Sequence, residues 1–265
     1  MIIGVISNTA RTGKTTLMMA LAYSYSRSQK RKVAVFSTGS LRHIVDPLMS
    51  LQEKDEAATT GVFKALLESK SIKGDTLFNY AVRGGRDEVY VFDLFTGFKD
   101  AQKSMEFLVS TTKSIDADMV LVEIAKDIKW PGNKEMMDSC DVIIDVFTPD
   151  IASIGDMKQY SKNLNQRDAK KTLYVCNQYD ARIMSEKKLS GFTAKGQSEV
   201  LVLDYNPSYV KFSMDGDMTG WTNKFMQGHE DFLKMRSQLE KLMQALYDTP
   251  KRKRIIPVKD WDNTA

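Results

Sequence analysis

The sequence predicts an α/β fold built on one doubly wound, mostly parallel sheet with helices on both faces. Two observations predict it: short β-rich runs recur along the 265 residues, and amphipathic stretches of helical length lie between them. Several runs are almost continuously apolar, which is typical of strands that a parallel sheet buries on both faces. Strands and helices that alternate along a whole chain favour one domain of this class. We assign residues 1–249 to that domain and residues 250–265 to a basic C-terminal tail.

The elements can be placed in order along the chain. Strands are expected at residues 2–6, 32–36, 88–92, 119–122, 142–147, 172–176 and 200–203. Helices are expected at residues 15–28, 61–70, 99–113, 151–163 and 232–247. Ligands of such sheets bind beyond the carboxyl ends of the strands. The loops at those ends are therefore candidate walls of one site: 7–13, 37–40, 93–98, 123–127, 148–150, 177–180 and 204–208.

Composition narrows the class of protein without naming a function. Apolar residues make up 42% and charged residues 27%, which is ordinary for a soluble globular protein. The net charge of +4 allows contact with nucleic acid or an anionic membrane but requires neither. Two cysteines and two histidines indicate neither a disulfide framework nor a zinc site. The N-terminal apolar run, residues 1–6, is too short for a signal peptide, so we expect a cytoplasmic protein.

The stretch SNTARTGKTT follows the first predicted strand and opens the first predicted helix. A phosphate-binding loop needs backbone N–H groups at a helix N-terminus, a lysine and a magnesium-binding hydroxyl. Gly13 permits close approach, Lys14 supplies the charge and Thr15 the hydroxyl, although Asn8 stands where the usual pattern has glycine. We therefore predict binding of a nucleotide with Mg²⁺. The predicted nucleotide-binding residues of this loop are Arg11, Thr12, Gly13, Lys14, Thr15 and Thr16.

On these motifs the chain resembles the deviant-Walker P-loop ATPases that include MinD, ParA and the pilus-localisation protein TadZ. Their loop reads K-G-G-x-G-K-[ST], and the likeness in order and spacing continues over roughly residues 1–212. Four later segments carry it: DMVLVEIA at 118–125, DVIIDVFTPDIASI at 141–154, TLYVCNQYD at 172–180 and VLDYNPSYV at 202–210.

The resemblance implies that the nucleotide is ATP, and it implies roles for residues outside the loop. Glu123 falls on the family's switch aspartate, so it is the expected catalytic carboxylate and, with Thr15, the expected magnesium site. Asn177 would read the adenine, or it simply ends a strand as a turn residue. Asp204 and Pro207 would flank the base. The resemblance also implies an ATP-promoted homodimer that works with a protein partner to position a pilus or secretion machine, a plasmid or a chromosome.

Two departures from the family concern hydrolysis. The signature lysine falls on Thr9 and the catalytic aspartate of the second strand falls on Ser37. A threonine cannot neutralise charge that develops on a phosphate, and a serine cannot act as the carboxylate that orients water. Arg11 could supply the missing charge and Asp93 the missing carboxylate. We therefore expect weak or absent hydrolysis.

The C-terminal region has two interpretations, and so has the function. The apolar face of helix 232–247 is expected to pack on the sheet, the alternative being a membrane anchor. The basic cluster 251–254 is expected to be part of a solvated tail. The alternatives are contact with a membrane surface, which would make the protein peripheral at a membrane or a cell pole, and contact with DNA without sequence preference. Two other functions stay open: a nucleotide-free pseudo-ATPase that acts as a structural adaptor, and a metabolic ATP-dependent enzyme on the same fold.

Overall fold

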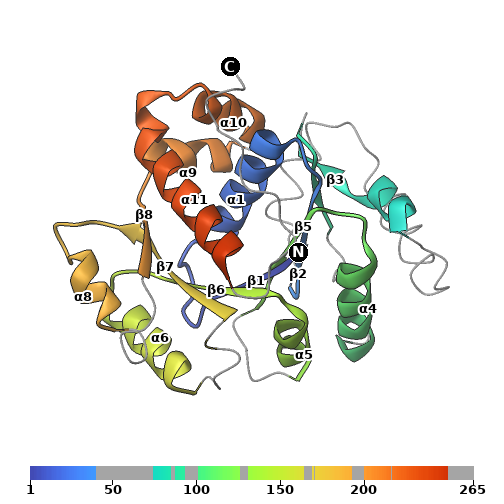
Figure 1. The fold of residues 1–265 in the computed structure, drawn as a ribbon, viewed down its shortest axis with the longest axis horizontal. Coiled ribbons are helices and arrows are strands. Elements are labelled where there is room, and N and C mark those ends of the chain that lie inside the picture. The colour runs from blue at the N-terminus through green and yellow to red at the C-terminus, as the bar shows by residue number, and fades with distance from the viewer. Residues whose placement is uncertain are drawn as a thin grey trace.

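A computed structural model describes the chain over residues 1–39, 74–84, 87–92, 101–125, 131–163, 169, 171–192, 200–215 and 217–249. It contains an 8-stranded sheet in the order β3-β4-β2-β5-β1-β6-β7-β8 (Figure 1). Only β3, which pairs with β4, runs antiparallel to its neighbour in this sheet. The strands are β1 (Ile2–Ile6), β2 (Val33–Ser37), β3 (Val82–Arg83), β4 (Val89–Val91), β5 (Met119–Glu123), β6 (Val142–Phe147), β7 (Thr172–Tyr179) and β8 (Val200–Asp204).

Helices cover both faces of the sheet (Figure 1). One face carries α1 (Lys14–Gln29), α9 (Pro207–Met214), α10 (Met218–Met226) and α11 (Glu230–Asp248). The other carries the 3-10 helix η1 (Gly74–Tyr80), α4 (Ala101–Ser114), α5 (Pro131–Ser139), α6 (Ile151–Asn163) and α8 (Glu186–Ser190). The predicted doubly wound α/β class is confirmed.

The seven predicted strands are present, and four of the five predicted helices are present with ends that shift by two residues at most. The fifth predicted helix, residues 61–70, lies outside the described residues, as does the predicted tail 250–265. The sequence did not predict β3, η1, α5, α8, α9 or α10. All six are short, so few residues carry their hydrophobic pattern.

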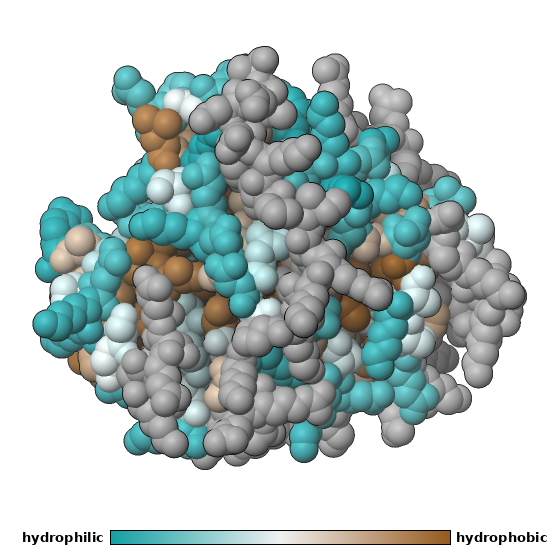
Figure 2. All heavy atoms as spheres, in the orientation of Figure 1, coloured by the Kyte–Doolittle hydropathy of each residue, from teal (hydrophilic) through white to brown (hydrophobic). Residues whose placement is uncertain are grey.

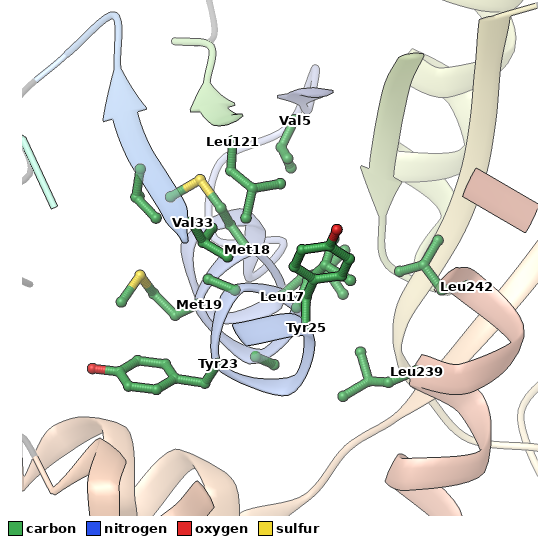
Figure 3. Close-up of a cluster of buried hydrophobic side chains, with 14 of the residues drawn as sticks. Val5, Leu17, Met18, Met19, Tyr23, Tyr25, Val33, Leu121, Leu239 and Leu242 are labelled. Atoms are coloured by element: carbon green, nitrogen blue, oxygen red, sulfur yellow. The ribbon is translucent and has the colours of Figure 1, made fainter. Parts of the chain in front are cut away.

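Many of the buried hydrophobic residues gather around α1, which lies between the sheet and α11 (Figure 3). Every residue from Leu17 to Ser26 is buried, so this helix lacks a solvent face along most of its length. Leu239 and Leu242 of α11 point toward α1 in Figure 3. A helix held on all sides in this way fixes the position of its N-terminus, where the phosphate-loop motif lies.

The apolar face of α11 packs against the core, as predicted. Its buried residues are Phe232, Met235, Leu239, Leu242, Met243 and Leu246. Hydrophilic side chains cover most of the described surface seen in Figure 2, and hydrophobic residues appear between them in smaller areas. Among the helices of the described residues, none has both the length and the apolar character that crossing a membrane requires.

Candidate functional site

The loop between β1 and α1 has the geometry of the predicted phosphate site. Gly13 adopts a left-handed conformation with φ 77° directly before α1. A Cβ atom added at this position would lie 2.3 Å from the amide nitrogen Nδ2 of Asn177. Glycine is therefore required here for both its backbone and its missing side chain. Arg11 is also left-handed, with φ 62°, which is unusual for a residue with a side chain.

Short hydroxyl contacts hold the loop in this shape. Ser7 Oγ donates to the carbonyl of Thr9 over 2.8 Å, and the hydroxyl of Thr12 donates to Ser7 Oγ over 2.9 Å. The hydroxyl of Thr9 donates in turn to Asp156 Oδ2 of α6, over 2.9 Å. The position of the family's signature lysine is thus bonded to the protein's own α6. The predicted site residue Thr12 is buried and supports the loop from within.

Three predicted residues from two elements meet in front of the loop. Thr15 Oγ1 donates to Glu123 Oε2 over 2.7 Å. Lys14 Nζ donates to the carbonyl of Ile124 over 3.0 Å and lies 3.9 Å from Glu123 Oε1. Burial lowers the pKa of Lys14, while the carboxylates of Glu123 and Asp145 act in the opposite direction. The structure therefore brings together an ammonium, a hydroxyl and a carboxylate at the N-terminus of a helix.

The end of β2 adds hydroxyl groups to this cluster rather than a carboxylate. Ser37 lies beside Glu123 in the sheet register, and its Oγ accepts from the backbone N–H of Gly39 over 3.0 Å. Thr38 Oγ1 accepts from the backbone N–H of Ala125 over 2.8 Å. The second of these bonds joins the loop after β2 to the loop after β5. Asp93, the candidate substitute carboxylate, lies outside the described residues.

Asn177 is close to the loop, but its amide is engaged. Nδ2 donates to the carbonyl of Thr12 over 2.8 Å, and the side chain is buried. The register of β7 against β8 shifts between Asn177 and Tyr179, and Gln178 in between has φ 55°. In this structure the amide thus supports the phosphate loop. Contact of the same amide with a base stays a prediction.

The predicted base-flanking residues lie at the end of β8 and at the start of α9, and Asp204 contacts α11. Gln238 of α11 bonds Asp204 twice: its Nε2 donates to Asp204 Oδ1 over 2.7 Å, and its Oε1 accepts from the backbone N–H over 3.0 Å. Lys234 of α11 forms an ion pair with the other carboxylate oxygen. Pro207 is the first residue of α9. The carbonyl of Thr16 accepts from the buried hydroxyl of Tyr209, on α9, over 2.7 Å.

Sequence reasoning missed several polar residues that support the site. Asp156, Tyr209 and Gln238 are in this group, and only their tertiary contacts identify them. Asp145 is different, because a carboxyl within the apolar run VIIDVF is visible in the sequence. An acidic residue in a strand buried on both faces was a signal that could have been followed.

The arrangement is suited to holding an anion. The first N–H groups of α1 have no partner within the helix, and Lys14 and Thr15 extend from its first turn. A carboxylate that bonds the threonine hydroxyl, as Glu123 does, is also placed to hold magnesium-bound water. The donor set thus fits a phosphate with its magnesium ion.

No protein-family model and no curated protein matches the chain, whereas solved structures match its fold. The MinC:MinD cell division protein complex from Aquifex aeolicus matches with a TM-score of 0.64 and 17% identity, over 98% of each chain. A ParA family ATPase from Chlorobium tepidum matches with a TM-score of 0.66 and 12% identity, over 91% of this chain and 98% of that one.

A third match carries a ligand. It is the septum site-determining protein MinD from Pyrococcus horikoshii complexed with Mg-ADP, with a TM-score of 0.62 and 17% identity over 93% of this chain and 98% of that one. Identities this low describe backbone architecture, and function has to be argued from the site itself. The chain has the fold of the MinD/ParA-like P-loop ATPases.

Proposed function

We propose that this protein is an ATP-binding switch of the MinD/ParA/TadZ type. The observation that carries the proposal is the meeting of Lys14, Thr15 and Glu123 at the N-terminus of α1. In the proposal Lys14 and the loop N–H groups bind the β- and γ-phosphates, and Thr15 binds Mg²⁺. The bound ion would bridge and neutralise phosphate oxygens. Glu123 would exchange its bond to Thr15 for a magnesium-bound water.

The remaining predicted residues contribute less to this proposal. Thr12 and Gly13 shape the loop, and Thr16 lies in the first turn of α1, near the expected α-phosphate. Arg11 extends from the loop as an exposed cation. Asn177 would need to release Thr12, at least in part, before it could read a base. Asp204 and Pro207 would border the base from the β8 side of the sheet.

We propose that hydrolysis is weak or absent. Thr9 is bonded to Asp156 and cannot offer an ammonium to a nucleotide, and Ser37 is bonded to Gly39 and carries no charge. Replacing both, as Thr9→Lys with Ser37→Asp, should therefore raise the rate of ATP hydrolysis measured by phosphate release. The single variants are the controls. A double variant no faster than wild type would show that these positions do not limit the reaction.

The energetic logic of the switch is a shift between two populations. If ATP binds the dimer more tightly than the monomer, it moves the balance toward the dimer by that difference in affinity. Such a dimer in the cytoplasm would recruit a protein partner and position a larger assembly. The membrane surface, a cell pole and DNA are the candidate locations, with tail 250–265 as the candidate contact.

The experiment that tests the switch is a calorimetric titration of magnesium-ATP into the purified protein, with light scattering to follow mass. We expect micromolar binding and a doubling of mass. Lys14→Ala should weaken binding by about a hundredfold, because a charge-assisted contact to phosphate is lost. Lys113→Ala is the matched control, since this exposed lysine lies in the last turn of α4, on the face of the sheet opposite α1.

A second candidate function is supported by the same contacts. Glu123 already bonds both Lys14 and Thr15, so the chain can satisfy this cluster without a ligand. A structural adaptor that binds no nucleotide would show no heat of binding in wild type or in Lys14→Ala. That result would overturn the switch and favour the adaptor.

A further inference from the structure

A carboxyl group lies buried in the strand next to β1, at the level where the phosphate loop begins. Asp145 is in β6, beside Ile6, the last residue of β1 before the loop. Its side chain is 1% exposed, and neither carboxyl oxygen has a hydrogen-bond partner within the described part of the chain. Burying a carboxyl group that makes no hydrogen bond costs free energy, whereas burying an apolar side chain at the same position would not. Because this costly group lies next to the phosphate loop, we examine what Asp145 could do for the candidate site.

The group that balances this carboxyl is Lys14. Its ammonium attracts the carboxyl group of Asp145 in β6, and it lies 3.9 Å from Glu123 Oε1 of β5. Since β1 lies between β5 and β6, these two carboxyl groups come from the strands that flank the strand before the loop. Other titratable groups on the neighbouring elements include Tyr174 of β7, beside Asp145 in the register, and Asp156 of α6, which bonds Thr9. Strand β7 also carries Cys176 and Tyr179, and α6 also carries Lys158, Tyr160 and Lys162.

The charge of Asp145 changes with pH close to neutrality. Burial raises the pKa of Asp145 to about 8, and the nearby ammonium of Lys14 only partly opposes this. The carboxyl is therefore mostly neutral at pH 7 and ionised above pH 8. A triphosphate bound over the loop adds negative charge close to this group, and a buried charge is poorly screened. Phosphate and an ionised Asp145 thus disfavour one another.

We propose that Asp145 is a positioning residue of the phosphate site, which acts on Lys14 from beneath the loop and couples the binding of a nucleoside triphosphate to the uptake of a proton. The inference rests on the nucleotide binding proposed above. When neutral, Asp145 leaves the ammonium free to turn toward the phosphates. When ionised, it holds the ammonium toward the sheet and repels the ligand.

The test is calorimetry of magnesium-ATP binding in two buffers that differ in their enthalpy of ionisation. At pH 8 wild type should take up about half a proton per nucleotide bound, and close to none at pH 6. The affinity of wild type should fall about tenfold between pH 7 and pH 9. Asp145→Asn keeps the shape of the side chain without its titration, so it should lose the uptake and most of the fall in affinity.

Two further variants make the result decisive. Asp145→Val answers the same question if the asparagine variant does not fold, since valine suits a buried strand. Asp141→Asn is the matched control: it lies before β6, at the end far from the loop, and should keep the uptake of wild type. Uptake that persists in both Asp145 variants would come from Lys14 and would overturn the inference.

The two proposals fail in different ways. Wild type that binds magnesium-ATP without proton uptake at pH 8 would overturn the role of Asp145 and leave the ATP switch intact. Wild type that binds no nucleotide at any pH would overturn the switch, and the coupling would fall with it.

Discussion

The phosphate end and the base end of the candidate site use their polar side chains differently. At the phosphate end, Lys14 and Thr15 extend from the first turn of α1 and share one carboxylate, Glu123. At the base end, the expected contacts are already bonded to the protein. Asn177 holds the carbonyl of Thr12, and Asp204 is bonded by α11.

This difference indicates where binding energy for a ligand can come from. At the phosphate end a ligand oxygen can replace Glu123 as the acceptor for Lys14 and Thr15, so one set of bonds is exchanged for another. At the base end Asn177 has to give up a buried bond to the main chain before it gains one to a base. We therefore expect the phosphates, rather than the base, to dominate affinity.

The largest expected effect tests the buried carboxyl beneath the phosphate end without any nucleotide. The pKa of Asp145 is raised from 3.8 to about 8 in the folded protein. The folded state therefore holds a proton that the unfolded state has lost between these pH values. Wild type should lose stability as pH rises from about 4 to about 8, by on the order of a few kcal/mol relative to Asp145→Asn.

The measurement is urea denaturation of both proteins at several pH values. The difference in free energy of unfolding between them should change steadily from pH 5 to pH 8. If this difference stayed constant over the range, the pKa of Asp145 would be the same in the folded and the unfolded protein. Burial beneath the phosphate end would then leave the carboxyl group unaffected.

A smaller effect tests the contact that joins the two ends. Gly13→Ala would place a methyl group 2.3 Å from Asn177 Nδ2 in a left-handed residue, so we expect a loss of about 2 kcal/mol in the free energy of unfolding. Asn177→Ala in the same chain should recover part of this loss. Gly155→Ala is the matched control, since a Cβ atom there meets nothing within 4 Å and favours helix α6.

The smallest effects compare bonds made by the C-terminal helices. Tyr209→Phe removes the buried bond to the carbonyl of Thr16 and should cost about 1 kcal/mol, measured by chemical denaturation. Lys234→Met removes an exposed partner of Asp204 and should cost less than about 0.5 kcal/mol. A larger loss from Lys234→Met than from Tyr209→Phe would contradict this ranking of buried over exposed contacts.

The sequence was most informative where a pattern is repeated or local. Apolar runs such as 142–147 predicted the strands, because burial on both faces requires nearly every residue to be apolar. The loop and the start of α1 were predicted from adjacent residues, because Gly13, Lys14 and Thr15 act within one turn of the chain. Short elements such as α8 and α10 were missed, since few residues carry their pattern.

Tertiary structure decided how the polar side chains are paired. Asn177 bonds a residue 165 positions earlier, and Tyr209 bonds one 193 positions earlier. Such pairs depend on the order of strands in the sheet and on how α9 and α11 pack over α1, which no local pattern contains. By itself the sequence determined the α/β class and the glycine-containing loop before α1, because both follow from periodicity and neighbouring residues. The structure decided which groups surround Lys14, because burial and long-range register set the charge and the partners of a side chain.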